Sequence, residues 1–97
     1  MEQIKEFIEE ESIVDDSFFN VIMHNDDVTP FEYVIMVLNL IFEHPVDDAL
    51  KLTMHIHQNG SAIVATLPMD EAYKLVEEVD KTNERYGFLL QTTVEKA

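Results

Sequence analysis

The stretch His24-Asn25-Asp26-Asp27-Val28-Thr29-Pro30-Phe31 decides the fold of this chain, because it is a sharp polar break between two apolar runs. The run before it, residues 18–23, is short and rich in Phe, Val and Ile, which favours a β-strand. The run after it, residues 33–42, is longer and is preceded by helix-start signals. We therefore predict a strand over residues 17–24, a tight loop, and a helix from about residue 30 to residue 42.

The helix-start signals lie at the end of this stretch. Thr29 is a favoured N-cap residue, Pro30 suits the first helical position, and Glu32 completes a Thr-x-x-Glu capping box. This prediction leaves the polar residues 25–27 at the lip of a helix N-terminus. Two interpretations are open: turn residues that also interact favourably with the helix dipole, or a site that binds a cation or an ammonium group.

The remaining elements follow from turn signals and apolar periodicity. A second helix is expected from Pro45 or Val46 to the stop at Gln58-Asn59-Gly60, then a strand over residues 61–67. A third helix opens at Pro68-Met69-Asp70 and stops at Gly87, and a last strand covers residues 88–94. The predicted fold class is α+β: a small β-α-α-β-α-β domain in which a three-stranded antiparallel sheet packs against three helices.

Composition limits the function classes. The 97 residues are enough for one small domain, and the absence of cysteine rules out disulfides, thiolate zinc sites and a Cys nucleophile. The formal net charge of −14 repels nucleic acids and anionic membranes and favours basic partners. No apolar run reaches the roughly 20 residues that a membrane span needs. With an acidic leader that is unlike a secretory or transit peptide, we expect a cytoplasmic protein without a nucleic-acid or membrane partner.

The first residues differ in character from the rest. Residues 1–17 are expected to be an acidic flexible arm, and residues 18–97 the core domain. Ile4, Phe7 and Ile8 share a helical face, but an isolated helix shorter than about 12 residues is rarely stable. A purely solvating tail is the alternative.

Catalytic and metal sites find little support. No serine lies in a nucleophile-elbow context, and Gly60 and Gly87 are the only glycines, so no phosphate-binding glycine loop exists. A metal site would need His24, His55 and His57 with Asp26–Asp27, yet the two helical histidines are about 200° apart around a helix. We expect no enzyme activity, no metal and no cofactor.

Several motifs in a fixed order resemble the ClpS family, the adaptors that deliver proteins with destabilising N-terminal residues to a Clp protease. They are Asn-Asp-Asp-x-Thr-Pro-x-Glu at residues 25–32, His57-x-x-Gly60-x-Ala62, Leu89-Leu90, and the closing Glu95-Lys96-Ala97. The resemblance covers residues 19–97 and implies the family's fold.

The resemblance also implies a binding site for a free N-terminus. In the family an Asn-Asp pair and a helix histidine hold the α-amino group, and here these match Asn25, Asp26 and His57. The apolar pocket for a first residue such as Leu, Phe, Tyr or Trp corresponds to Thr29, Phe31, Val34, Thr53, Ile56 and Leu89. From periodicity alone, the same residues are also explained as ordinary core.

Two positions of the predicted pocket depart from the family pattern. Phe31 stands where the family usually has Met, and Thr53 stands where Met or another apolar residue is common. We expect Phe31 to make the pocket rim stiffer and Thr53 to open room opposite it, so the preferred N-terminal side chain stays open.

The implied partner is the N-terminal domain of a Clp ATPase of the ClpA or ClpC type. The family docks partly through the start of the third helix, near Asp70, where this sequence departs from the pattern, and the unfoldase engages the leader. The alternative is a protein of the same fold with another partner, such as a ribosomal-stalk-like interaction domain. The acidic third helix and the Asn25-Asp26-Asp27 loop argue against that alternative.

Overall fold

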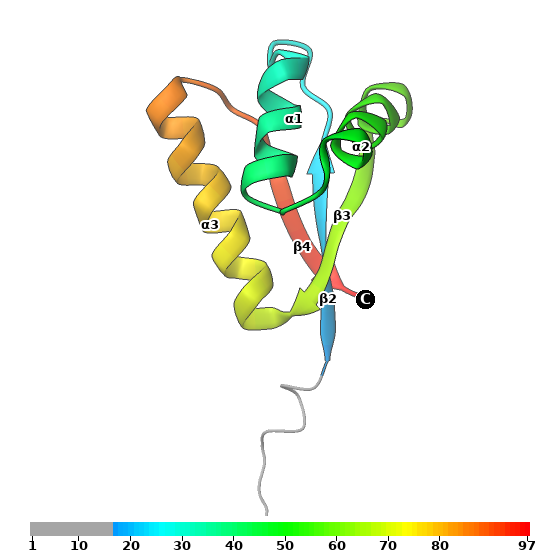
Figure 1. Ribbon diagram of the computed structural model, residues 1–97. Helices are drawn as coiled ribbons and strands as arrows, with labels where there is room; N and C mark the ends of the chain where they lie inside the picture. The colour runs from blue at the N-terminus through cyan, green and yellow to red at the C-terminus, as the bar shows by residue number, and fades with distance from the viewer. Residues whose placement is uncertain (1–16) are drawn as a thin grey trace, which may run out of the picture.

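The computed structural model describes residues 17–97, and the expected arm therefore lies outside the described residues except for Ser17. The elements are β2 (Phe18–His24), α1 (Phe31–Leu40), α2 (Val46–Asn59), β3 (Ser61–Pro68), α3 (Met69–Tyr86) and β4 (Thr92–Lys96). Their order, β-α-α-β-α-β, confirms the predicted fold class (Figure 1).

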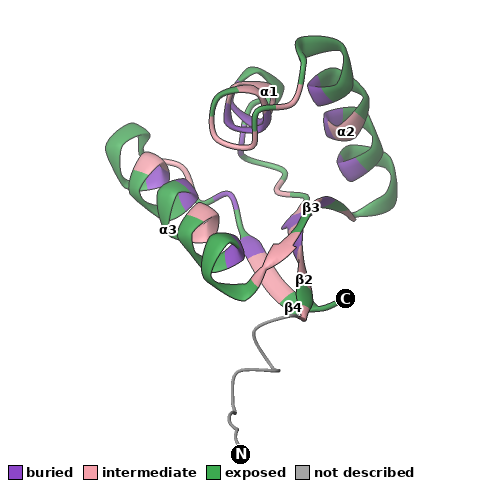
Figure 2. Ribbon diagram, turned by 60° about the horizontal axis from the view of Figure 1, so that its bottom comes forward, coloured by how far each residue is buried: buried purple, intermediate pink, exposed green. Residues whose placement is uncertain are grey.

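The sheet is antiparallel, with the strand order β3-β2-β4. Figure 2 shows the helices on one side of the sheet, with buried positions turned toward the space between the layers. The most apolar strand, β2, lies in the centre, and its alternate residues Val21 and Met23 are 0% exposed. Alternation along the strand therefore faces one set of side chains to the helices.

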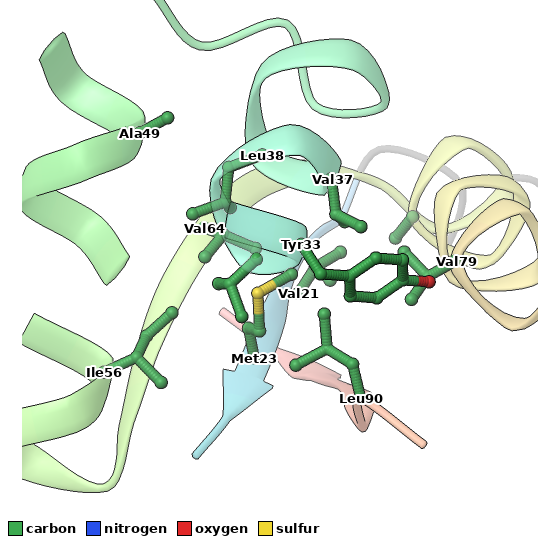
Figure 3. Packing of buried hydrophobic residues seen from close by; sticks show 12 residues of the cluster. Val21, Met23, Tyr33, Val37, Leu38, Ala49, Ile56, Val64, Val79 and Leu90 are labelled. Atoms are coloured by element: carbon green, nitrogen blue, oxygen red, sulfur yellow. The ribbon is translucent and has the colours of Figure 1, made fainter. Parts of the chain in front are cut away.

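Helix α1 lies between α2 and α3 (Figure 1), which explains why its sequence is apolar on more than one side. Figure 3 shows side chains from the sheet and from all three helices meeting under α1. Burial of each large apolar side chain contributes roughly 1.5–3 kcal/mol. The buried core consists of Val21, Met23, Tyr33, Val34, Val37, Leu38, Ala49, Ile56, Val64, Ala72, Val79 and Leu90.

The predicted capping box at the start of α1 is wrong. Pro30 is the N-cap residue, and no side chain caps the helix. The hydroxyl of Thr29 donates instead to the Asp26 carboxylate. Because α1 begins at Phe31 and Pro30 is its N-cap, Thr29 lies one residue before the position from which a side-chain oxygen accepts the first helix amides.

The first helix is also shorter than predicted, since it ends at Leu40 rather than at residue 42. The amides of both Ile41 and Phe42 donate to the carbonyl of Val37, at 2.9 and 3.3 Å, which closes the last turn. Glu43 follows with a φ of 63°, in the left-handed region. The helix therefore stops without a glycine.

The last strand begins at Thr92, four residues later than the predicted start at Phe88. Gly87, with a φ of 79°, ends α3, and the amides of Gly87 and Phe88 both donate to the Asn83 carbonyl. Because α3 holds this part of the backbone, residues 88–91 connect the layers instead of extending the sheet. None of the helices in residues 17–97 has the length and apolar character needed to cross a membrane.

Candidate functional site

Three segments that are distant in sequence meet at one end of the sheet. The amide of Asn25 donates to the Gly60 carbonyl at 2.9 Å, which ties the polar loop to the end of α2. The amide of His24 donates to the Gln91 carbonyl at 3.0 Å, which ties it to the segment before β4. The loop is therefore held between α2 and residues 88–91.

A small cavity lies where these segments meet, and we call it the site cavity. Its volume is about 10 Å³, close to the space for a single water molecule. Every predicted site residue except Leu89 lines it. The lining residues are His24, Asn25, Asp26, Thr29, Phe31, Val34, Thr53, Ile56, His57 and Leu90.

The Asp26 carboxylate organises the polar side of the cavity. Its Oδ1 accepts the amide of Val28 at 3.0 Å, and its Oδ2 accepts the hydroxyl of Thr29. These bonds, above all the one from Thr29, hold the pKa of Asp26 below its ordinary value. Asp26 is thus ionised at neutral pH and fixed in orientation, which suits it to attract a cation.

Asn25 extends this polar side. Its amide nitrogen Nδ2 donates to Asp27 Oδ1 at 3.4 Å, which turns the NH₂ group toward the loop. The side-chain carbonyl oxygen is the atom of Asn25 that can accept a hydrogen bond from a ligand. The loop thus offers two different acceptors, an amide oxygen and a carboxylate, at one lip of the cavity.

The mouth of the cavity is formed by two rings. The ring of Phe31 packs edge-on against the ring of His57, with centroids 5.0 Å apart and an interplanar angle of 69°. Phe31 is 40% exposed and His57 is exposed at the end of α2. Both predicted site residues therefore lie on the exposed side of the cavity.

The inner walls are apolar. Val34, Ile56 and Leu90 are buried. Thr53 is buried too, and its hydroxyl donates to the Ala49 carbonyl at 2.8 Å. Its only polar hydrogen is therefore used within α2, and Thr53 presents no unpaired donor to the cavity.

Leu89, the remaining predicted pocket residue, does not line the site cavity but a neighbouring hollow, which Asn25, Asp26 and Thr29 also line. Leu89 is 85% exposed and lies over a neighbouring hollow of about 340 Å³, whereas Leu90 is 2% exposed and lines the site cavity. No local sequence pattern distinguishes the two neighbouring leucines, and in the structure Leu90 shares the buried side with Thr92, two residues later. His24 is the other lining residue that we did not predict, and its Nε2 lies 2.8 Å from Thr93 Oγ1.

The histidines do not gather. In residues 17–97 no group of three or more His, Cys, Asp or Glu side chains is placed to hold a metal ion. His55 pairs with Asn59 at 3.1 Å and lies over a different hollow together with His44. Only His57 and His24 line the site cavity.

Comparison with known proteins identifies the family. Residues 15–93 match the family model described as ATP-dependent Clp protease adaptor protein ClpS. The chain belongs to the ClpS family. The Clp adaptor of Leptothrix cholodnii is 39% identical over 79 residues, which is 81% of this chain and 69% of that protein. The Clp adaptor of Clostridium acetobutylicum is 37% identical over 76 residues, or 78% of this chain and 75% of that protein.

The fold agrees with the family as well. A solved structure of Agrobacterium tumefaciens ClpS2 bound to L-phenylalaninamide superposes with a TM-score of 0.80 at 32% identity. The match covers 84% of this chain and 98% of the other. The ClpS protein described here is thus an adaptor of the ATP-dependent Clp protease by family, with the family's β-α-α-β-α-β core.

Proposed function

We propose that this ClpS protein binds substrate proteins by a destabilising N-terminal residue with a large apolar side chain and delivers them to a Clp ATPase. One observation carries the proposal: Asn25, Asp26 and His57 border the same cavity whose walls are apolar. A free N-terminal residue has these two parts, an ammonium group and a side chain next to it.

The polar lip fits the ammonium group. An α-amino group has a pKa of about 8, so it is mostly protonated at neutral pH. It would find the Asp26 carboxylate already ionised, with the Asn25 oxygen as a second acceptor. His57 accepts through a ring nitrogen in its neutral form. An N-terminus that is acetylated has no charge to offer and cannot use this arrangement.

The apolar walls fit the side chain once the cavity widens. A volume of about 10 Å³ is far smaller than a Leu or Phe side chain. Val34, Ile56 and Leu90 are buried in the core. Phe31, in contrast, is 40% exposed, and its ring packs edge-on against the exposed ring of His57. Phe31 is therefore the residue that moves aside. Burial of a Leu or Phe side chain is worth about 1.5–3 kcal/mol, which separates these residues from Ala or Ser.

The proposed arm, ATPase partner and cellular location are those of the ClpS family. We propose residues 18–97 as the binding core and residues 1–17 as an acidic arm used during delivery. The partner is the N-terminal domain of a ClpA-type or ClpC-type ATPase, met partly through the start of α3 near Asp70, and the location is the cytoplasm. The solved ClpS2 structure carries L-phenylalaninamide, which has a free amine next to a Phe side chain and supports the same ligand class here.

Labelled peptides test the proposal. We expect peptides that start with Phe or Leu to bind, and peptides that start with Ala, or the acetylated twins, to bind at least about tenfold more weakly. Binding should also weaken above about pH 8, where the peptide amine loses its proton. Equal affinity for free and acetylated peptides would rule the proposal out and favour a domain of this fold with an unrelated partner.

A further inference from the structure

One wall of the site cavity comes from the irregular segment of residues 88–91, in which one of two neighbouring leucines is exposed and the other is buried. Leu89 is 85% exposed, whereas Leu90 is 2% exposed and lines the cavity. Figure 3 shows the Leu90 side chain pointing into the core, toward Tyr33 and Met23. In an extended segment a shift of one residue exchanges the two faces. Something must therefore fix the register of this segment.

Asn83 of α3 fixes it from one side. Its side-chain Nδ2 donates to the Leu90 carbonyl at 2.7 Å, and its Oδ1 accepts the hydroxyl of Tyr33 at 2.7 Å. Its backbone carbonyl accepts the amides of Gly87 at 2.7 Å and Phe88 at 3.0 Å. One buried residue thus makes hydrogen bonds at both ends of the turn that leads into the cavity wall.

The chemistry of the site requires an amide at this position. The Leu90 carbonyl can only accept, so the NH₂ of Asn83 must face it, and the Asn83 oxygen is left for Tyr33. An aspartate would place an oxygen against the Leu90 carbonyl, and an aliphatic residue would leave that carbonyl unpaired. The geometry is therefore specific to a side chain with one donor and one acceptor.

Tyr33 supports the same arrangement. Its ring lies 4.5 Å from the ring of Phe88 and 6.0 Å from the ring of Tyr86, on either side of Gly87. Burial, with a smaller contribution from Tyr86, raises the pKa of Tyr33, so its hydroxyl stays protonated and keeps donating. The helix that carries Phe31 and Val34 is thereby connected to the wall that carries Leu90.

We propose that Asn83 is a positioning residue for ligand selection: by bridging Tyr33 and Leu90 it holds residues 88–91 in the register that turns Leu90 into the site cavity. Asn83 does not itself line the cavity. Its effect on selection rests on the function proposed above, because it determines the shape of the wall that the first side chain meets. Its effect on the register does not depend on any ligand.

Two readouts in the full chain test this role. A soluble paramagnetic agent should broaden the methyl NMR signals of Leu89 and spare those of Leu90 in the free wild-type protein. The second readout is the ratio of affinities for peptides that start with Phe and with Leu. If a residue serves stability alone, its substitution should change the melting temperature and leave both readouts unchanged.

The variants are Asn83→Asp, which keeps the acceptor for Tyr33 but loses the donor to Leu90, and Tyr33→Phe, which removes only the hydroxyl. The matched control is Asn39→Ala, because Asn39 Nδ2 donates to the His44 carbonyl at 2.8 Å, outside the site cavity. The control loses a side-chain to backbone bond of the same type.

We expect Asn83→Asp to expose the Leu90 methyls to the agent and to change the Phe-to-Leu affinity ratio by about threefold or more. Tyr33→Phe should shift both readouts in the same direction by a smaller amount, and it decides the matter if Asn83→Asp does not fold. Asn39→Ala should leave both unchanged. Folded Asn83 or Tyr33 variants with wild-type readouts would overturn the proposal, as would an equal shift in Asn39→Ala. If the wild type binds neither peptide, the proposed function fails, and the methyl readout alone decides the role of Asn83.

Discussion

The ring of Phe31 at the start of α1 meets the ring of His57 at the end of α2 edge-on, with centroids 5.0 Å apart. Phe31 belongs to the apolar part of the site cavity and His57 to its polar part, so their contact brings the two parts together at the opening of the cavity. Under the proposed function we therefore expect a change in either ring to affect both the entry of a ligand side chain and the placement of its amine.

Phe31 should bias the site toward aromatic first residues. A ligand ring packed edge-on against Phe31 gains about 0.5–1.5 kcal/mol beyond burial, and Leu gains no such contact. We expect Phe, Tyr and Trp peptides to bind at least as well as Leu peptides, and β-branched Ile and Val peptides to bind poorly. Phe31→Met should shift the preference toward Leu in competition binding. Phe18→Met, at the exposed start of β2, is the control, and an identical ranking for Phe31→Met and wild type would show that Phe31 is only packing.

His57 should matter for binding and little for stability, because it is exposed. A hydrogen bond with a charged group is worth about 1.5–3 kcal/mol, so His57→Ala should weaken peptide binding by roughly tenfold or more. His55→Ala, on another side of α2 and paired with Asn59, should bind as the wild type does. Isothermal titration with thermal melts measures both effects. Unchanged affinity in a normally folded His57→Ala would remove His57 from the amine site.

Asp26 should give a pH-dependent contribution to stability. Its pKa is lowered in the folded state by Thr29 and Val28, so the contribution is complete above the unfolded value of about 3.9 and is lost as the pH falls through the folded value. The wild type should therefore be more stable than Asp26→Asn at pH 7, and the difference should shrink below about pH 4. Urea unfolding at several pH values measures it, and Asp27→Asn corrects for the change in net charge. A difference that grows on acidification would contradict the assignment.

Thr92 offers a route to higher stability. Within residues 17–97 its Oγ1 is buried and has no hydrogen-bond partner, and an unpaired buried polar group costs about 1–3 kcal/mol. Thr92→Val removes the hydroxyl at nearly constant shape and should raise the free energy of unfolding by about 1 kcal/mol. Thr53→Val is the contrast, since the Thr53 hydroxyl is bonded to Ala49 and its loss should bring no such gain. A lower melting temperature for Thr92→Val would mean that the hydroxyl has a partner in solution.

The leader should act in delivery and not in peptide binding. Deletion of residues 1–16 is expected to leave peptide affinity within about twofold of wild type, since residues 17–97 already supply both the polar and the apolar residues of the site cavity. Degradation of a reporter with an N-terminal Phe by the Clp protease should fall strongly. A Gly/Ser segment of the same length separates the effect of length from that of sequence. Loss of peptide affinity on deletion would show that the leader contributes to the site.

Much of the fold could be predicted because its signals are local. The polar stretch at residues 24–31 separates a strand from a helix, and left-handed glycines at Gly60 and Gly87 end α2 and α3 as expected. Asn25, Asp26 and His57 meet because the loop and the end of α2 are joined by one backbone bond from Asn25 to Gly60. Their roles as ligand-binding residues stay predictions.

The errors came from contacts that no local pattern shows. Thr29 does not cap α1, because the helix begins one residue later than the capping box requires, and its hydroxyl donates to Asp26 within the loop. The choice between Leu89 and Leu90 depends on Asn83, a polar residue in a helix whose partners are in another helix and in the following segment. Register of this kind is decided by tertiary structure.

The small volume of the site cavity has a consequence for affinity. At about 10 Å³ the cavity must widen before the side chain of the proposed ligand enters, so under that proposal only molecules with the mouth open are competent to bind. The apparent dissociation constant then exceeds that of the open form by the inverse of that fraction, about a hundredfold if roughly one molecule in a hundred is open. A change that merely favours the open population would tighten binding to every peptide alike, without a single new contact to any of them.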